Sequence, residues 1–154
     1  ERYVAIADLL YEKGRLGQKT GAGWYKYDEA RNASVDPEVE AIILSAAAEK
    51  GVRRRDFSEE EILDRLLCAM INEGAKVLEE GVAGSAVDID MVFLHGYGFP
   101  GHRGGPMFHA DVLGPRTVLE KIEQFAAEDG YFWRPAPLLR RLADEGGAFA
   151  TVNA

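Results

Sequence analysis

The sequence predicts an all-α protein that carries one short irregular or extended segment near residues 14–35. Two observations support this fold class. Apolar residues recur at helical spacing along most of the 154 residues, and prolines and glycines divide the chain into segments. Proline stands at the first position and glycine just past the end of several helical stretches, as is typical of helix termini. No alternation of β-branched residues is long enough to predict a sheet.

Two helices are expected to flank the irregular segment. Residues 2–13 carry a broad apolar stripe that ends at Gly14. Residues 36–50 form a helix that Asp36 can cap and that the following proline can start. Between these helices four glycines alternate with polar residues, and the run Trp-Tyr-Lys-Tyr at 24–27 favours a short extended conformation. This part is therefore expected to be the least regular of the chain.

The longest predicted helix spans residues 58–81. Ser58 and Glu61, three residues later, have the spacing of a capping box, and Gly81 supplies a stop signal. The helical spacing of the apolar residues places the core of the domain here, with three side chains expected to be buried: Leu66, Leu67 and Met70. Four shorter helices, bounded by proline, serine or glycine, are expected at residues 86–95, 106–113, 115–129 and 137–145.

The charge balance restricts the classes of partner. Eighteen basic residues against 26 acidic ones give a net charge of −8, so neither nucleic acid nor an anionic membrane surface is expected to bind. No apolar run approaches the roughly 20 residues of a membrane-spanning helix. The single cysteine, Cys68, lies in an apolar helical run. This context predicts an inert buried thiol and suits a reducing cytoplasm.

Three motifs invite a chemical interpretation, and each lacks part of its pattern. Residues 96–101 match the dinucleotide fingerprint G-x-G-x-x-G, but a helix rather than a strand is predicted before them. Residues 17–20 lack the glycines that a P-loop needs ahead of Lys-Thr. Three histidines spaced by seven lack the ligand partners of a usual metal site: His95, His102 and His109. The residues alone thus predict no catalytic, metal or cofactor site, and they give the glycine-rich loop at 96–105 a structural role.

Three stretches, taken together and in order, are similar to a known family. Gly-Arg-Leu-Gly-Gln-Lys-Thr-Gly-Ala-Gly-Trp-Tyr at 14–25 resembles a segment of the 3-hydroxyacyl-CoA dehydrogenases. Within 72–90, the runs Asn-Glu-Gly, Leu-Glu-Glu-Gly and Asp-Ile-Asp resemble the helical domain of that family. Within 96–107, Gly-Tyr-Gly-Phe-Pro and Arg-Gly-Gly-Pro-Met resemble its multifunctional members, which fuse an enoyl-CoA hydratase to the dehydrogenase.

The resemblance implies the C-terminal helical part of an NAD-dependent 3-hydroxyacyl-CoA dehydrogenase of fatty-acid β-oxidation. In that family a Rossmann domain binds NAD and carries the catalytic His-Glu pair, and two helical repeats follow it. Residues 1–35 are then the tail of the first repeat and residues 36–154 are the second repeat. Because the Rossmann domain is expected to lie outside this sequence, the chain alone is expected to be inactive, with no catalytic, metal or cofactor-binding residue of its own.

The implied partners are an acyl-CoA substrate and the Rossmann domain and first helical repeat of the same protein. A thiolase subunit and a homodimer of the chain stay open, and the expected location is the bacterial cytoplasm. Two other functions remain as alternatives: a stand-alone helical dimerisation or interaction module, and a small metal-dependent hydrolase. A dinucleotide fingerprint upstream of the chain would favour the enzyme, whereas stoichiometric bound metal would favour the hydrolase.

Two positions differ from the family pattern. His95 stands where the bacterial multifunctional enzymes commonly carry a tyrosine associated with the acyl-CoA, so it is the one substrate-binding residue expected here. The alternative is a histidine hydrogen-bonded to nearby backbone at a helix end. Asp64 stands where the first repeat carries its active-site asparagine, and an ionised carboxylate cannot donate a hydrogen bond. The second repeat is therefore expected to serve packing rather than chemistry.

Overall fold

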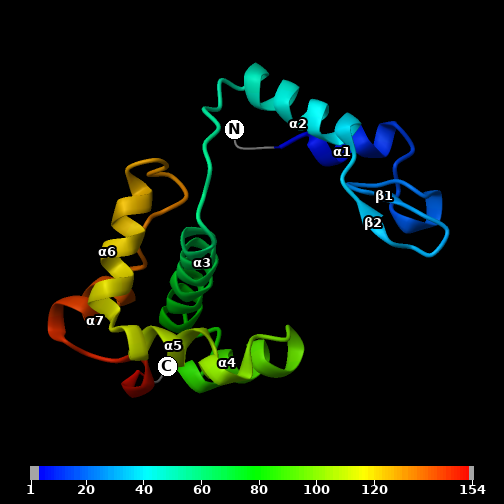
Figure 1. Ribbon diagram of the computed structural model, residues 1–154. Coiled ribbons are helices and arrows are strands. Elements are labelled where there is room, and N and C mark those ends of the chain that lie inside the picture. The colour runs from blue at the N-terminus through cyan, green and yellow to red at the C-terminus, as the bar shows by residue number, and fades with distance from the viewer. Residues whose placement is uncertain (1–3, 153–154) are drawn as a thin grey trace. The chain divides into compact units, whose positions relative to one another are not determined.

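The computed structural model describes residues 4–152, and helices make up most of it, as the sequence predicts (Figure 1). The chain divides into two compact units, Glu1–Asp56 and Phe57–Ala154. The expected boundary between the helical repeats lies at residue 35. It is defined by similarity of sequence and not by contacts, so it stays a prediction. Within the described residues, no helix has the length and apolar character needed to cross a membrane.

The first unit joins two helices through a glycine-rich loop and a small antiparallel hairpin. Its first helix is shorter than the predicted span of 2–13, the beginning of which lies outside the described residues. Its second helix begins after Asp36, whose carboxylate accepts a hydrogen bond from the Glu38 N–H at 3.1 Å, as a capping residue does. The elements in order are α1 (Ile6–Glu12), η1 (Gln18–Thr20), β1 (Lys26–Tyr27), β2 (Ala33–Ser34) and α2 (Pro37–Glu49).

The hairpin differs from the single extended segment that the sequence predicts. Strand β1 pairs with β2, with Lys26 opposite Ser34, so a second extended stretch is present. The turn between them is closed by Asp28, whose carboxylate accepts from the backbone N–H of Asn32 at 2.8 Å and from its side-chain amide at 2.9 Å. Arg31 takes the left-handed conformation, with φ of 66°. Strands of two residues are too short for alternation to reveal them.

Arg15 holds the first unit together. Its Nε donates to the carbonyl of Gly23 at 3.0 Å, and its guanidinium forms ion pairs with Asp36 and Glu38. The side chains of Arg15 and Asp36 are almost fully buried. Among residues 4–56, the buried apolar side chains are Leu10 and Val39. The unit therefore depends on a charged network more than on an apolar core.

The second unit packs five helices and two short 3-10 turns around one core. Helix α6 packs closely on α7, α4 on α5, and α3 contacts all four of the other helices. The predicted spans 106–113 and 137–145 are confirmed, whereas the predicted span 115–129 ends three residues early. The elements are α3 (Glu59–Glu79), α4 (Ala86–Gly96), η2 (Gly101–Arg103), α5 (Pro106–Leu113), α6 (Pro115–Ala126), α7 (Pro137–Glu145) and η3 (Phe149–Thr151).

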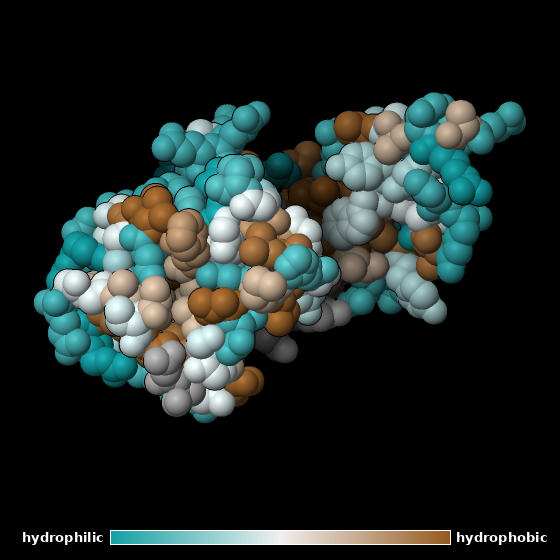
Figure 2. All heavy atoms as spheres, turned by 90° about the horizontal axis from the view of Figure 1, so that it is seen from below, coloured by the Kyte–Doolittle hydropathy of each residue, from teal (hydrophilic) through white to brown (hydrophobic). Residues whose placement is uncertain are grey.

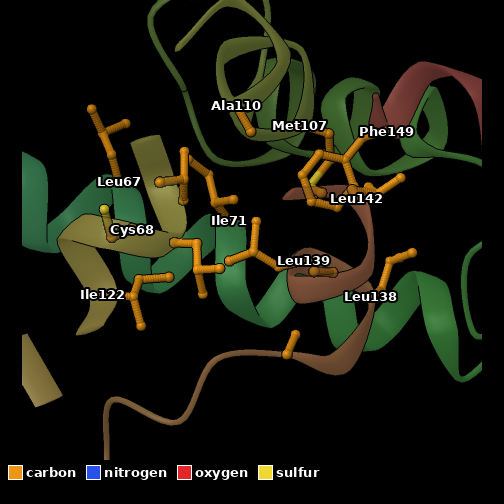
Figure 3. Packing of buried hydrophobic residues seen from close by; sticks show 14 of the residues in the cluster. Leu67, Cys68, Ile71, Met107, Ala110, Ile122, Leu138, Leu139, Leu142 and Phe149 are labelled. Atoms are coloured by element: carbon orange, nitrogen blue, oxygen red, sulfur yellow. The ribbon is translucent and has the colours of Figure 1, made fainter. Parts of the chain in front are cut away.

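The core of this unit gathers side chains from distant parts of the sequence (Figure 3). Residues of α3 face residues of α5, α6 and α7, and the ring of Phe149 closes one end. The largest fully buried apolar side chains include Ile71, Leu78, Met107, Ile122, Leu138, Leu139 and Phe149. Burial of this apolar surface is the main stabilising contribution to the fold.

Helix α3 corrects one expectation from the sequence. Leu67 is buried, but Leu66 is 58% exposed and Met70 is only partly buried. The prediction of a buried Leu66 was therefore wrong. The reason is that apolar residues lie on two faces of α3, and only one of these faces packs into the core. The buried residues of that face are Leu67, Cys68, Ile71, Ala75 and Leu78.

Candidate functional site

A buried asparagine on α3 organises the chain before α7. The Asn72 side chain is 4% exposed, and its amide nitrogen donates to the carbonyl of Arg134 at 2.8 Å. Its amide oxygen accepts from the Ala136 N–H at 2.7 Å. Because both ends of the amide are satisfied by backbone groups, Asn72 has a structural role and points at no ligand.

A buried carboxylate on α4 caps another helix. Asp90 accepts hydrogen bonds from the N–H groups of Met107 at 2.7 Å and Phe108 at 3.0 Å, at the beginning of α5. The residue before that helix is Gly105, which has no side chain to cap with. Its φ is 100°, and a Cβ at this position would clash with the side chain of Asp90. Burial raises the pKa of Asp90, although the two N–H donors oppose the shift. The glycine-rich loop and Asp90 thus form one helix-capping arrangement.

Two more acids satisfy helix ends across the fold. Glu79 accepts from the N–H of Leu138 at 3.2 Å, at the start of α7. Asp111 accepts from the N–H groups of Phe149 at 2.7 Å and Ala150 at 2.9 Å, at the start of η3. Both carboxylates occupy positions where a helix dipole favours negative charge. Their roles are accounted for without acid–base chemistry.

Asp64 takes part in a contact between helices. Its carboxylate forms an ion pair with Lys121 of α6. The neighbouring Arg65 binds Glu61 at 2.9 Å and Glu128 at 2.8 Å, and its guanidinium lies 4.3 Å from the centre of the Phe125 ring. Asp64 stands at the position that was compared with an active-site asparagine. Its charge is paired there with that of Lys121 on the protein surface.

The glycine-rich loop lacks the structural context of a nucleotide site. Helix α4 precedes residues 96–101, and the turn η2 begins within them. In the part of the chain that the structure describes, the strands are the two of the hairpin, so no βαβ unit is present. Gly98, Gly104 and Gly105 have positive φ values of 68°, 74° and 100°. Such backbone conformations favour glycine, which is what the structural role predicted for this loop requires.

The other candidate residues are dispersed. His95 and His102 are exposed, and His109 is partly buried with its ring 3.2 Å from Nη1 of Arg103. Burial and the charge of Arg103 lower the pKa of His109. Among residues 4–152, no three histidine, cysteine or acidic side chains gather in a metal-binding group. Burial raises the pKa of Cys68 to about 11, so its thiol stays protonated near neutral pH.

A groove of about 790 Å³ lies between α3 and α4. The two carboxylates on its wall, Glu73 and Asp88, lie among apolar side chains. Val82 and Tyr97 are both about three-quarters exposed, and Figure 2 shows apolar side chains reaching the surface among polar ones. His95 is not part of the wall. The apolar lining includes Met70, Val77, Val82, Ile89, Val92, Phe93 and Tyr97.

The groove was not foreseen from the sequence. Its signal was present in the second apolar face of α3, where Met70 and Val77 line the groove and are only partly buried. The sequence pattern could not tell that face from the core face, because both repeat at helical spacing. An apolar surface of this kind is typical of contact with another protein surface or domain.

The comparison with known families decides the relationship. Residues 62–149, more than half of the chain, match the family described as 3-hydroxyacyl-CoA dehydrogenase, C-terminal domain. The chain belongs to this family. The matched residues are those of the second unit, from the first turns of α3 to the beginning of η3. The match confirms the family resemblance found in the sequence. The helical structure of this 3-hydroxyacyl-CoA dehydrogenase C-terminal domain confirms the predicted all-α fold.

Relatives of the domain are much longer proteins. The chain is 42% identical over 149 residues to the peroxisomal bifunctional enzymes of Danio rerio and Homo sapiens, covering 94% of itself and 21% of each relative. It is 33% identical to a peroxisomal fatty acid beta-oxidation multifunctional protein of Arabidopsis thaliana, covering 92% of itself and 20% of that protein. The chain thus spans about a fifth of the curated relatives that it matches.

A solved structure shares the fold. The dehydrogenase part of multifunctional enzyme 1 from C. elegans superposes with a TM-score of 0.64 at 24% identity, over 92% of this chain and 33% of that one.

The expected location is corrected by these comparisons. The relatives are named as peroxisomal or glyoxysomal enzymes of animals and plants, so the expectation of a bacterial cytoplasmic protein was wrong. The expectation rested on the single cysteine and on the resemblance to bacterial multifunctional enzymes, and a lone cysteine does not identify the compartment.

Proposed function

We propose that this chain is the C-terminal helical domain of an NAD-dependent 3-hydroxyacyl-CoA dehydrogenase of fatty-acid β-oxidation, carried within a multifunctional protein. The observation that supports this most directly is the family match over residues 62–149. The buried polar groups Asn72 and Asp90 are used to hold backbone segments in place. In this proposal the domain contributes packing and the acyl-CoA side of the parent enzyme, and the isolated chain is expected to have no activity.

NAD binding belongs to another part of the parent protein. The loop at 96–101 lies after a helix, and the described residues offer no parallel strands above which a dinucleotide could lie. The Rossmann domain and the first helical repeat of the same protein are the proposed partners, with an acyl-CoA as substrate. A thiolase subunit and a homodimer of the chain are further proposals that no described contact tests.

A stand-alone interaction module is the second candidate, and the groove between α3 and α4 favours it. Its apolar wall is open to solvent in this chain. The length of the relatives favours the first candidate, because about four-fifths of each relative lies outside the matched part and supplies further domains. Deleting the region that corresponds to 57–154 from the parent protein separates the two: the enzyme loses NADH-dependent reduction of acetoacetyl-CoA, whereas an independent module would leave that activity intact.

The isolated chain provides a second test. We expect no reduction of acetoacetyl-CoA by NADH above the rate without protein. Calorimetry with NAD should show no binding tighter than about 100 μM, which corresponds to roughly −5.5 kcal/mol. Turnover or tighter binding would mean that the catalytic part lies within this chain, contrary to the proposal.

His95 is proposed to line the acyl-CoA cleft of the parent enzyme. It lies exposed near the end of α4, two residues before Tyr97, which lines the groove. In the parent enzyme His95→Ala should raise KM for the acyl-CoA more than it lowers kcat, since it removes binding rather than chemistry. His102→Ala, also at an exposed histidine, is the matched control and should change neither value. An unchanged KM in His95→Ala would reject this role.

A further inference from the structure

An exposed stretch with three consecutive arginines connects the two units. All of residues 50–58 are exposed, and residues 52–58 belong to no helix or strand (Figure 1). Arg53, Arg54 and Arg55 occupy the middle of this stretch. Seven residues span up to about 25 Å when extended, which is long enough to fill the substrate cleft of a protease. Exposed irregular segments of this kind are preferred sites of proteolysis.

The two ends of the stretch are fixed, so the irregular part is short. On one side the N–H of Val52 donates to the carbonyl of Ala47 at 2.8 Å and closes the end of α2. On the other side the ring of Phe57 lies 5.5 Å from the guanidinium of Arg65 on α3. The part of the chain without regular structure between these contacts is therefore residues 53–56.

Most basic residues elsewhere in the described chain lie in regular elements or closed turns. Two do not. Arg15 is nearly buried and paired with Asp36. The exposed Arg134 directly precedes Pro135, and trypsin cleaves poorly before proline. Arg31 lies in the hairpin turn, with a left-handed backbone and the Asp28–Asn32 hydrogen bonds on either side. A protease binds its substrate in an extended form, so cleavage within a helix requires local unfolding first. The basic residues in helices of the second unit are Arg65, Lys76, Arg116, Lys121, Arg140 and Arg141.

We propose that residues 53–55 form a proteolytic processing site for a protease that cleaves after arginine, and that cleavage there releases the second unit as an intact domain. One water is consumed at the bond after Arg53 or Arg54, which yields a new carboxylate and a new amino group. Asp56 places a negative charge directly after Arg55, so the two earlier bonds are the favoured ones.

The two products have different fates. The second unit keeps a core that includes Ile71, Met107 and Phe149, none of which has an exposed surface, so it resists further digestion. The first unit buries few apolar side chains, Leu10 and Val39 among them, and its opening exposes further sites. The proposal therefore makes a prediction about the order of cleavage as well as its position.

Limited digestion of the full chain with trypsin, followed in time by mass spectrometry, tests the site. We expect the first cut after Arg53 or Arg54 and a persistent product that starts at residue 54 or 55. Replacing all three residues by glutamine, as R53Q/R54Q/R55Q, should slow the first cut by about tenfold or more, because the next sites need local opening. The matched control R31Q removes an exposed arginine from the hairpin turn and should leave the first cut unchanged.

Circular dichroism before and after digestion provides a readout besides the cut itself. The persistent product should melt at the same temperature as the main transition of the intact chain. A first cut elsewhere, an unchanged rate in the triple variant, or rapid loss of the product that contains α3 to α7 would each overturn the proposal.

Discussion

Buried polar residues of the second unit show that a chemically suggestive side chain can have an entirely structural use. Asn72 and Asp90 lie in the family-like motifs, and both are buried. Their partners are backbone groups 62 to 64 and 17 to 18 residues further along the chain. Leaving a buried backbone donor without an acceptor costs more than the net gain of one hydrogen bond. These residues are therefore expected to matter for stability.

Asn72→Ala should lower the free energy of unfolding by about 2–4 kcal/mol, because it leaves the Arg134 carbonyl and the Ala136 N–H without partners inside the protein. Urea unfolding followed by circular dichroism measures the change. The neighbouring Glu73→Ala removes a side chain that is 68% exposed and should change the free energy by no more than about 0.5 kcal/mol. Equal effects of the two substitutions would contradict the assigned role of Asn72.

Asp36 gives the first unit a defined dependence on pH. Burial alone would raise its pKa, but the hydrogen bonds from Arg15 and the Glu38 N–H, with the charges of Arg15 and Lys26, outweigh burial and lower it below the ordinary value of 3.8. Because the folded pKa is the lower one, the stabilisation is present above pH 3.8 and is lost as pH falls through the folded pKa.

Trp24 fluorescence in a Trp133→Phe background, measured on acidification, should therefore report loss of the first unit below pH 3.8. Asp36→Asn keeps an acceptor for the Glu38 N–H but cannot titrate, so its acid transition should be much weaker. The pKa of Asp28 is also lowered, mainly by its hydrogen bonds with Asn32, so its protonation acts in the same direction. The same acid transition in both proteins would show that Asp36 does not control it.

Helix α3 is the element that joins the core to the surface groove. One of its faces carries Ile71 and Leu78 into the core. The other carries Met70 and Val77 to the wall of the groove, and also the exposed Ile62 and Leu66, which lie outside the groove. A helix that is apolar on both faces normally has neighbours on both faces. The second face is therefore where further parts of the parent protein are expected to pack.

A matched pair of substitutions distinguishes the two faces of α3 in the isolated chain. Ile71→Ala removes a fully buried side chain and should cost about 2–5 kcal/mol. Leu66→Ala removes a side chain that is 58% exposed and should cost about 1 kcal/mol or less. Chemical denaturation of both variants gives the comparison. A loss of several kcal/mol in Leu66→Ala would mean that this face is covered, for instance by a second copy.

At the scale of the whole molecule, the two units differ in what holds them together. The second unit has a continuous apolar core built from all five of its helices and η3. The first has the Arg15 network and few buried apolar groups. Chains of fewer than about 60 residues with a small core are marginally stable on their own. The stability of the chain is therefore expected to reside in the second unit.

A chain shortened to residues 57–154 should unfold cooperatively, within about 4 °C of the main transition of the full chain, a shift that corresponds to roughly 1 kcal/mol. A peptide of residues 1–56 should show no cooperative transition, since its apolar core is too small. Calorimetry of the two pieces makes the measurement. A cooperative transition in the shorter piece would show that the charged network suffices for folding.

The sequence by itself determined the fold class and most helix ends. Proline and glycine act through local backbone geometry, so Pro106, Pro137 and Gly146 marked helix ends that the structure confirms. The family motifs likewise led to the correct family from residues close together in the chain. These features depend only on residues that are close together in the chain, so they can be interpreted from the sequence without the tertiary structure.

Only the tertiary structure decided which face of α3 is buried, what Asn72 and Asp90 bind, and where the groove lies. Leu66 and Ile71 have similar sequence surroundings, and packing against α5, α6 and α7 alone distinguishes them. The partners of Asn72 are more than 60 residues away, beyond the reach of any local pattern. Burial and long-range hydrogen bonds are properties of the folded chain, because they depend on which distant segments come together.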